Sequence, residues 1–359
     1  MDRSTRRVLV GMGAGLPLVA LGAARRWSHP GTTPPIHDAR GRLERRGIAT
    51  LEPIRLAGEE RWLLVRGRSV HQPLLLFLSG GPGSAELAWM RHFNASLEEH
   101  FLVAAWEPGG GARAGEEPRM ESLLAEADEL LELLTSRFSQ EKVFLVGHGW
   151  GSVLGVLLAQ RRPERIHAYV STGQRVNFLE SDTVSHLRAY ERAMRHGDAA
   201  TLAKLARMGP PPYIGRDRVR RYQTLERLAG LHAGRGALLP DPRALALRTP
   251  EYSLRDKLHL ALAGRSPTAS PRLMDLNLER QVPRLDVPVW FLLGREDAVT
   301  PSELAVRYFD ALEAPAKTLL WFEHSGHQPA FEEPEHFNSL LIERVRAEGT
   351  ALPPDIVLH

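Results

Sequence analysis

A short stretch in the middle of the chain has the spacing of a catalytic turn but lacks the side chain that would act there. The apolar run Val143–Val146 predicts a buried strand, and the run Val153–Leu158 predicts a helix. Between them lies Gly147-His148-Gly149-Trp150-Gly151. A strand, a glycine turn and a helix are the setting of the nucleophile elbow, Gly-x-Ser-x-Gly, whose outer glycines are needed because two backbones pass too closely for a Cβ atom. The middle residue should carry the nucleophile, and here it is Gly149, which has no side chain.

Two candidate partners of this turn follow apolar runs near the end of the chain. Asp297 comes shortly after Phe291-Leu292-Leu293, and His327 comes shortly after Leu320-Trp321-Phe322. Because loops at the carboxyl ends of parallel strands meet in one crevice, we expect both side chains to reach the turn. In such a site the carboxylate fixes the imidazole tautomer, and the imidazole takes the proton of the nucleophile. Backbone amides would hold the oxyanion, and we expect them from Trp150 and from Gly80 or Gly81.

The pattern around these residues predicts an α/β fold with a doubly wound, mostly parallel sheet. Apolar runs alternate with segments that have apolar residues at helical spacing, which is typical of a parallel sheet covered by helices on both faces. The predicted strands are 45–55 and 61–66, which form an antiparallel pair, and Pro73–Leu78, Phe101–Trp106, Val143–Val146, Ile166–Ser171, Pro288–Gly294 and Thr318–Phe322. The predicted helices between them are Leu87–Leu97, Glu121–Phe138, 153–158, Ser302–Leu312 and Pro334–Ala347.

The alternation stops in the segment 177–280, which predicts an inserted helical cap. No convincing strand occurs there, and prolines separate the candidate helices Arg188–Met194, Ala199–Met208, Val219–Leu231 and Leu254–Leu262. We therefore expect a core formed by 45–176 and 281–350, with the cap between its two parts. A small molecule or a short peptide is the expected ligand, bound under the cap.

The N-terminal residues predict a targeting segment rather than part of the domain. Arg3, Arg6 and Arg7 precede an apolar run that ends in small residues, as in a secretory signal, and the surroundings of Arg6-Arg7 resemble a twin-arginine signal. Residues 1–30 are therefore interpreted as a signal peptide or a membrane anchor, and 31–44 as a linker. The protein would then be exported to the periplasm or the exterior, or anchored to a membrane by this segment; the alternative is a cytoplasmic protein with an N-terminal extension.

Composition excludes several classes of site. The 359 residues contain no cysteine, which rules out disulfides, thiolate nucleophiles and cysteine-bound metals. The net charge of +3 is small for this length, and no basic block with interleaved aromatic residues occurs, so no nucleic-acid partner is expected. The histidines show no His-Glu-x-x-His motif, and no Gly-x-Gly-x-x-Gly fingerprint is present. We therefore expect neither a metal nor a cofactor, and the sequence does not indicate an oligomeric state.

Taken together, these motifs resemble the α/β-hydrolase superfamily, and most closely its prolyl-iminopeptidase-like branch. The resemblance covers about residues 51–345. It rests on Gly80-Gly81-Pro82-Gly83, on the turn 147–152, on Asp297 in Gly294-Arg295-Glu296-Asp297, and on His327 in Gly326-His327-Gln328-Pro329. It implies a helical cap over the site and hydrolysis of a small ester or amide, often of a peptide with an N-terminal proline.

Three departures from the family pattern lie in three different loops. The serine of the elbow is Gly149, and the histidine expected before the double glycine is Ser79. The third departure is in 106–114, where the polar residues of the family motif are replaced mainly by glycine, proline and alanine. The nearest hydroxyl, that of Ser152, is one helical turn further on and should point into the helix packing. His148 is expected to pack and hydrogen bond rather than to catalyse.

These departures leave three hypotheses. The protein is a non-hydrolytic binding homologue with a degenerate elbow (a pseudoenzyme). Alternatively, it is an enzyme in which Asp297 orients His327 as a general base without a covalent step. The third possibility is an ordinary hydrolase of small esters or amides whose nucleophile is substituted at position 149. Without an oxygen or sulfur atom at Gly149 no acyl-enzyme can form there, which argues against serine hydrolysis in the protein as it stands.

Overall fold

One eight-stranded sheet forms the centre of the computed structural model, which describes residues 31–38, 40–80, 86–106, 119–230, 242–254, 256–258 and 275–350. The strands are β1 (Ile48–Leu56), β2 (Glu59–Gly67), β3 (Leu74–Leu78), β4 (Leu102–Trp106), β5 (Val143–His148), β6 (Ile166–Thr172), β7 (Val289–Gly294) and β8 (Lys317–Phe322). Their order is β1-β2-β4-β3-β5-β6-β7-β8. The pairs β1–β2 and β2–β4 are antiparallel, and all other pairs are parallel. This confirms the predicted fold class.

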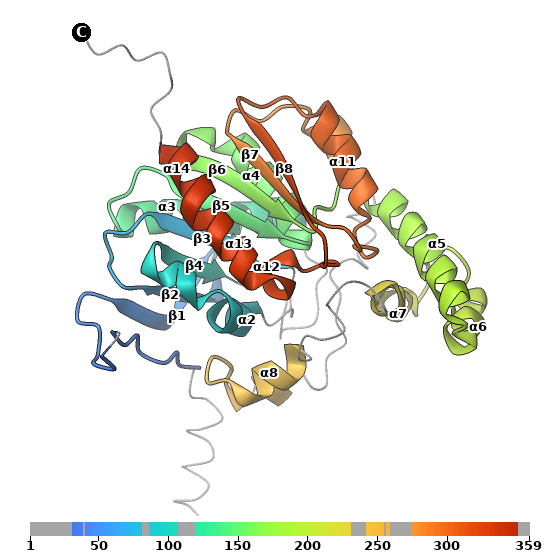
Figure 1. Ribbon diagram of the computed structural model, residues 1–359, viewed down its shortest axis with the longest axis horizontal. Coiled ribbons are helices and arrows are strands. Elements are labelled where there is room, and N and C mark those ends of the chain that lie inside the picture. Colours follow the sequence, from blue (N-terminus) through green and yellow to red (C-terminus); the bar gives the residue numbers. More distant parts are fainter. Residues whose placement is uncertain are drawn as a thin grey trace, which may run out of the picture.

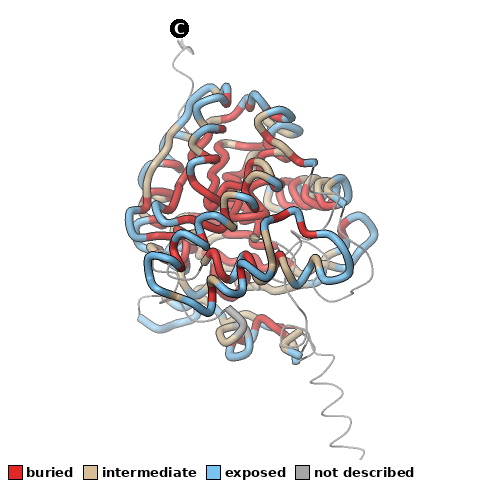
Figure 2. The backbone as a smooth tube through the Cα atoms, turned by 90° about the vertical axis from the view of Figure 1, so that its right-hand side faces the viewer, coloured by how far each residue is buried: buried red, intermediate tan, exposed pale blue. Residues whose placement is uncertain are grey.

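Helices cover both faces of the sheet because successive strand residues point to opposite sides. On β3, Leu74, Leu76 and Leu78 pack with α3 (Met120–Arg137), α4 (Trp150–Arg161) and α11 (Ser302–Ala311). Leu75 and Phe77 pack on the other side with α2 (Glu86–Phe93) and the C-terminal helices. The latter are α12 (Pro329–Glu332), α13 (Pro334–Leu340), the π-helical turn η6 (Leu341–Val345) and α14 (Arg346–Thr350). They lie across the sheet in Figure 1, and Figure 2 shows the buried parts of the chain gathered in the interior of the molecule.

The described residues between β6 and β7, which we call the cap, form helices beyond the carboxyl ends of the strands (Figure 1). These helices are α5 (Phe178–His196), α6 (Ala199–Met208), α7 (Arg218–Gly230), α8 (Pro242–Arg248) and α10 (Leu278–Gln281). The sequence predicted only the last part of α5. The helix starts earlier because the side chain of Asn177 accepts a hydrogen bond from the Glu180 amide at 3.2 Å and caps its N-terminus. The helix α8 was not predicted, and most of the helix predicted at 254–262 is outside the described residues.

A small apolar core of the cap continues into a loop of the central domain. It includes Leu205, Tyr213, Tyr222 and Leu225 of the cap, and Val299 of the loop after β7. The cap therefore packs directly on the loop that carries Asp297.

The helix predicted at 87–97 is in fact two elements. The helix α2 ends at Phe93, and a 3-10 helix η1 (Ala95–Glu99) follows. The buried side-chain amide of Asn94 between them donates to the Ala330 carbonyl and to Oδ1 of Asn338, both at 2.9 Å. The chain turns here so that this amide can reach its partners on α12 and α13.

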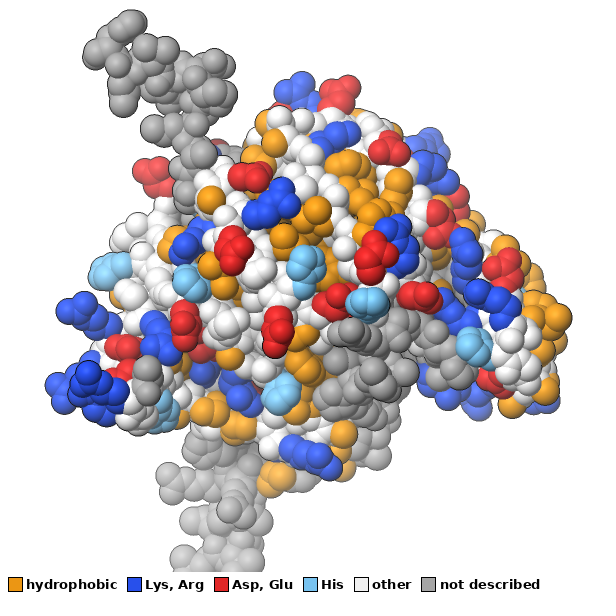
Figure 3. All heavy atoms as spheres, in the orientation of Figure 1, with side chains coloured by type: hydrophobic (Ala, Val, Ile, Leu, Met, Phe, Trp, Pro, Cys, Tyr) orange, Lys and Arg blue, Asp and Glu red, His pale blue; other side chains and the backbone are white. Residues whose placement is uncertain are grey.

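No described helix is both long enough and apolar enough to cross a bilayer. The segment interpreted as a signal or anchor, 1–30, is outside the described residues, as is the degenerate loop 107–114. On the face shown in Figure 3, basic and acidic side chains are mixed, as expected for a chain with a net charge of only +3.

Candidate active site

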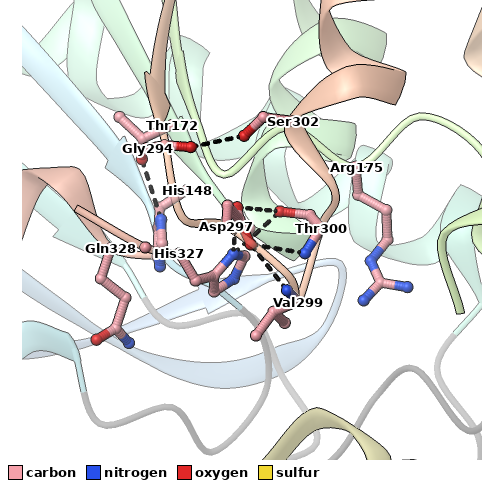
Figure 4. Close-up of polar contacts among 12 residues, drawn as sticks. His148, Thr172, Arg175, Gly294, Asp297, Val299, Thr300, Ser302, His327 and Gln328 are labelled. Carbon is pink, nitrogen blue, oxygen red and sulfur yellow. Dashed lines mark hydrogen bonds and ion pairs between the residues drawn. The ribbon is translucent and has the colours of Figure 1, made fainter. Parts of the chain in front are cut away.

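The candidate residues lie together at the carboxyl ends of four neighbouring parallel strands (Figure 4). His148 ends β5 and is followed by Gly149, and Thr172 ends β6. Asp297 lies in the loop after β7, and His327 lies in the loop after β8. The structure thus brings together the turn, the carboxylate and the imidazole that were predicted separately from the sequence.

The turn at Gly149 has the strained backbone of a nucleophile elbow. Its φ of 54° and ψ of −114° are a conformation that residues with a side chain rarely adopt. Gly151, two residues further on, must be a glycine for steric reasons, because a Cβ atom there would lie 2.2 Å from the Leu78 carbonyl oxygen. The elbow geometry is therefore present, and the residue at its centre, Gly149, has no side chain.

The imidazole of His327 faces the place where the missing side chain would start. A Cβ atom built on Gly149 would lie 3.1 Å from Nε2 of His327 and 3.6 Å from the Cα atom of Gly80. A side chain at this position would thus meet Nε2 directly.

The other ring nitrogen of His327 is held by a buried carboxylate. Nδ1 lies 3.0 Å from Oδ2 of Asp297, which is only 7% exposed. Because a carboxylate only accepts hydrogen bonds, Nδ1 carries a proton, and in the neutral ring Nε2 keeps its lone pair toward the elbow. This is the tautomer that a general base needs.

The carboxylate of Asp297 is itself fixed by its own loop. Its Oδ1 accepts from the amides of Val299 and Thr300, both at 2.9 Å. The hydroxyl of Thr300 donates to Oδ2 at 2.7 Å and also lies 3.0 Å from Nδ1 of His327. Thr300 thus joins the two members of the dyad in a triangle of polar contacts.

The dyad stabilises its own ionised form. Burial alone would raise the pKa of Asp297, but the charge and hydrogen bond of His327 and the contacts from Thr300 hold that pKa below its usual value. Burial alone would lower the pKa of His327, but the charge and hydrogen bond of Asp297 raise that pKa above its usual value. The imidazole therefore accepts a proton more readily than an isolated buried histidine would.

His148 has a different environment from His327. It is buried, and its Nδ1 lies 3.0 Å from the Thr172 hydroxyl. Burial, and secondly the charge of the nearby His327, lower the pKa of His148 to about 3. The ring is neutral at ordinary pH and packs at a centroid distance of 5.0 Å from the ring of His327. This is the packing and hydrogen-bonding role expected from the sequence.

Ser152 does not replace the missing nucleophile. Its hydroxyl is fully buried and donates to the Gly149 carbonyl oxygen at 2.6 Å. The Ser152 hydroxyl oxygen also accepts a hydrogen bond from the Arg175 amide at 3.1 Å. The hydroxyl therefore ties the elbow to the loop after β6, and its hydrogen bonds leave it turned into the protein, as expected.

The backbone amides expected for the oxyanion differ in their surroundings. The amide of Gly80 donates to Oε2 of the buried Glu86 at 2.7 Å. We therefore correct the expectation for Gly80, because its N–H is already used by a carboxylate that would also repel an oxyanion. The other candidate, Gly81, is outside the described residues. Trp150 is the first residue of α4, and the amides of a first helical turn have no acceptor within the helix.

Three further residues hold the site in place, and no role was predicted for them from the sequence. Glu86 holds Gly80, Thr300 holds the dyad, and Glu332 accepts from the amides of Gly326 at 2.8 Å and Gln328 at 2.9 Å on either side of His327. The spacing of Asp297 and Thr300 is typical of an aspartate that accepts from amides two and three residues ahead, so this signal was available. The contacts of Glu86 and Glu332 depend on how loops fold back and have no such signal.

No cluster of three histidine, cysteine or acidic residues suited to a metal ion occurs among the residues that the structure describes. Ser79, which stands where the family has a histidine, is buried, and its hydroxyl has no hydrogen-bond partner among the residues that the structure describes. The polar contacts of the site thus centre on Asp297 and His327.

Comparison with known proteins gives the same picture. The alpha/beta hydrolase fold family matches residues 73–334. The chain is 30% identical over 318 residues to the probable aminopeptidase YbaC of Bacillus subtilis (strain 168). This match covers 84% of this chain and 98% of YbaC. It is 23% identical to the putative carbamate hydrolase RutD of Stutzerimonas stutzeri (strain A1501), over 78% of this chain and 95% of that protein.

Solved structures agree at the level of the fold. A proline iminopeptidase from Mycobacterium smegmatis superposes with a TM-score of 0.57 and 16% identity, covering 84% of this chain and 99% of its own. The protein VinJ superposes with a TM-score of 0.56 and 20% identity, covering 83% and 98%. With the family match over most of the chain, an eight-stranded sheet of this order and a nucleophile-elbow turn, the chain belongs to the α/β-hydrolase fold family.

Proposed function

We propose that this protein does not work through an acyl-enzyme, and that His327, oriented by Asp297, acts as a general base on a water molecule or a substrate proton. The substrate would be a small ester or amide, or a short peptide, held under the cap. The observation that carries the proposal is the position of Nε2 of His327, which is 3.1 Å from where a side chain on Gly149 would begin. The base is in place, and the covalent nucleophile is not.

The dyad has the features of a working base. Asp297 accepts from two amides and a hydroxyl as well as from His327, so its position is strongly fixed. His327 presents an unprotonated Nε2 to the elbow when the ring is neutral. A water oxygen in place of the missing side chain would lie within hydrogen-bond reach of this nitrogen, at about 2.6–3.2 Å.

The step itself is a direct hydrolysis. Nε2 of His327 would take a proton from the water as its oxygen bonds to the substrate carbonyl carbon. The imidazolium would then return the proton to the leaving alcohol or amine as the C–O or C–N bond breaks. The amide of Trp150 at the N-terminus of α4 would stabilise the charge on the carbonyl oxygen. The names of two relatives, a probable aminopeptidase and a putative carbamate hydrolase, support an amide-type bond as the bond that is cleaved.

The experiment compares p-nitrophenyl acetate and proline p-nitroanilide hydrolysis by the intact protein and by His327→Gln. We expect measurable turnover in the first and its loss in the second, with no inhibition by a serine-directed fluorophosphonate. The matched control is His324→Gln, since this exposed histidine lies in the same loop and should not change the rate. Equal rates in the intact protein and in His327→Gln would contradict the proposal.

A second candidate function is binding without turnover. It is favoured by two departures from the family pattern, Gly149 at the elbow and Ser79, whose buried hydroxyl has no hydrogen-bond partner within the described ranges. In that case His327→Gln would leave ligand affinity unchanged, and neither substrate would be turned over by any variant.

A further inference from the structure

The outer side of the cap helix α5 carries a row of exposed side chains, most of which are apolar. We call this the α5 row, and its members are Leu179, Thr183, Leu187, Tyr190 and Met194. The four apolar members are between 40% and 59% exposed, and Figure 3 shows hydrophobic side chains at the right-hand edge, where Figure 1 shows α5. Neighbouring members are three or four residues apart, so all five lie on one side of the helix. A contiguous apolar row of this kind marks a contact surface.

The fold of the chain itself uses the opposite side of α5. There the hydroxyl of Ser185 donates to the Val299 carbonyl oxygen at 3.0 Å, and Nη1 of Arg192 donates to the Ala229 carbonyl oxygen at 3.1 Å. Ala189, between them, belongs to the apolar core of the cap. The inner side of α5 therefore holds the cap together and joins it to the loop of Asp297, and the α5 row points away from both.

A charged residue follows each of the four apolar members, so a row of charges runs along one edge of the α5 row. We call it the charged edge, and it consists of Glu180, Arg188, Glu191 and Arg195. Glu180 and Arg188 also pair with residues of α11, but each of these two side chains is still at least a third exposed. The two acids and two arginines have no net charge, so the edge does not favour an anionic lipid surface, which attracts lysine and arginine.

The spacing of the α5 row suits a second copy of the same helix that runs in the opposite direction. From Thr183 to Met194 the intervals are four, three and four residues, which is the spacing of a seam between two paired helices. When Thr183 lies beside Met194 of the second copy, Leu187 lies beside Tyr190 of that copy, and the reverse contacts follow from the two-fold symmetry. Each large apolar side chain of the seam is then covered.

The charged edge fits the same arrangement. A two-fold axis perpendicular to the helices brings the charged edges of the two copies together. In this register Glu191 and Arg188 of the second copy are offset by only about 3 Å along the helix axis, and so are Glu180 and Arg195 of the second copy. Every acid of the edge thus meets an arginine of the other copy, although no pairing was built into the choice of register.

We propose that this protein forms a symmetric dimer through α5, with the two helices antiparallel. One helix from each copy is a small interface of the kind that forms reversible complexes, so the dimer depends on protein concentration. The proposal does not depend on the proposed function, because the α5 row lies on the side of the helix that faces away from the loop of Asp297.

Sedimentation velocity of the full chain over a wide range of concentrations is the first test. We expect a shift from monomer to dimer as the concentration rises. Leu187→Glu places a charge in the centre of the interface and should weaken association about tenfold or more. Ile214→Glu is the matched control, since Ile214 is a 79% exposed apolar residue of the cap outside α5, and this variant should dimerise like the unmodified protein.

Two outcomes of this measurement would overturn the proposal. One is a dimer that Leu187→Glu leaves intact. The other is a protein that stays monomeric at every concentration. If such a monomer bound vesicles of anionic phospholipid and lost this binding in Leu187→Glu, the α5 row would be assigned to a lipid surface instead.

A reversal of charge tests whether the charged edges face each other. Glu191→Arg brings two positive charges together across the interface and should weaken association about fivefold at low ionic strength. Adding Arg188→Glu exchanges the two charges and should recover the association of the unmodified protein. A double variant that associates as weakly as Glu191→Arg alone would show that the two edges do not meet.

The direction of the helices can be tested by cross-linking, because the chain contains no cysteine. A mixture of Thr183→Cys and Met194→Cys chains should form a disulfide-linked dimer under mild oxidation, since these positions face each other in the antiparallel pair. Met194→Cys alone should not, because the two copies of this position are about 16 Å apart along the axis and a disulfide needs Cα atoms within about 7 Å.

The control for chance collisions is Ile214→Cys, which is exposed outside the interface. The mixture should cross-link much faster than this control. Cross-linking of Met194→Cys alone as fast as the mixture, or of the mixture no faster than Ile214→Cys, would contradict the antiparallel dimer.

Discussion

At the scale of single residues, position 149 decides which chemistry is open to the site. The backbone at Gly149 keeps the elbow conformation with a φ of 54°, and Nε2 of His327 faces it. A glycine adopts this conformation without strain, whereas the Cβ atom of any other residue would be in steric conflict with the backbone. The glycine thus avoids backbone strain at the turn, and under the proposed function it leaves a water molecule in the place of a covalent nucleophile.

Gly149→Ser should convert the protein into one that reacts with a fluorophosphonate. The new hydroxyl would lie against Nε2 of His327, which would take its proton. The Cβ atom at 3.1 Å from Nε2 is tight, so the loop of His327 must shift slightly, and we expect a loss of about 1–2 kcal/mol of unfolding free energy. Mass spectrometry of the labelled protein and urea denaturation measure the two effects.

Gly149→Ala is the matched control for this change. It carries the same Cβ atom and the same backbone strain but no hydroxyl, so it should lose the same stability without labelling. It should also stop general-base hydrolysis, because its methyl group occupies the place of the water. Labelling of Gly149→Ala would show that another residue reacts, and labelling of the unmodified protein would contradict the proposed function.

Thr300 is a positioning residue for the dyad, and Thr300→Val tests this role. The variant keeps the shape but removes the hydroxyl that contacts both Asp297 and His327. Loss of a hydrogen bond to a buried carboxylate should cost about 1.5–3 kcal/mol of stability. A less firmly held ring should also lower the hydrolysis rate about tenfold or more while leaving KM unchanged.

Thr300→Ser keeps a hydroxyl at this position and should therefore have the stability and the hydrolysis rate of the unmodified protein. The measurements are urea denaturation and steady-state kinetics on the same preparations. If the valine variant hydrolyses its substrate like the unmodified protein, the hydroxyl does not position the imidazole.

At the scale of elements, the sequence predicted the core of the fold well because its strands are continuous apolar runs. Such runs at Leu74–Leu78 and Val143–Val146 are buried on both faces, so their assignment needs no tertiary information. The order of elbow, Asp297 and His327 along the chain placed the dyad because parallel strand ends converge.

What the sequence did not predict depends on contacts between distant segments. Glu86 bonds the Gly80 amide across a loop, and Asn94 reaches two helices that come much later in the chain. Neither contact leaves a local pattern of spacing. The pairing of Arg175 with Asp182 was missed for the same reason, since a charged residue in a helix pattern is usually read as solvated.

A buried ion pair connects β2 with η1 at the edge of the molecule. Arg66 donates to both oxygens of Glu98, at 2.7 and 3.1 Å, and both residues are less than a tenth exposed. Its third nitrogen donates to Thr33 and Pro34, which secures the segment before β1. This pair thus anchors the first described residues to the sheet.

Glu98→Ala should therefore be strongly destabilising. It leaves the Arg66 guanidinium buried without a counter-charge, which costs about 3–5 kcal/mol. Urea denaturation measures the loss. The control Asp286→Ala removes the carboxylate of an exposed pair and should change stability by no more than about 1 kcal/mol. A similar small change in both variants would show that Arg66 finds water or another partner.

At the scale of the whole molecule, one buried ion pair joins the cap to the central domain, and the dyad lies close to it. Arg175 on the loop after β6 pairs with Asp182 on α5, and Asp297 pairs with His327 close by. The raised pKa of His327 gives stability that is present below its unfolded value and is lost as pH rises through the folded value. The lowered pKa of Asp297 gives stability that is present above its unfolded value and is lost as pH falls through the folded value.

Asp182 should give the opposite dependence on pH from Asp297. Burial raises the pKa of Asp182 from 3.8 to about 6, opposed by Arg175 and reinforced by the charge of Glu226. The folded state therefore binds the proton more tightly than the unfolded state, so Asp182 contributes stability at low pH that is lost as pH rises through about 6.

We expect the unfolding free energy of the unmodified protein to fall relative to that of Asp182→Asn between about pH 4 and pH 6, and the difference to be constant above pH 7. Urea denaturation across this range measures the difference, with Asp286→Asn as a control variant at an exposed aspartate. Glu226→Gln should move the fall to lower pH, since it removes a charge that disfavours ionised Asp182. If the difference between the unmodified protein and Asp182→Asn does not change with pH, Asp182 ionises alike in the folded and unfolded chain, and the cap is not coupled to the core by this group.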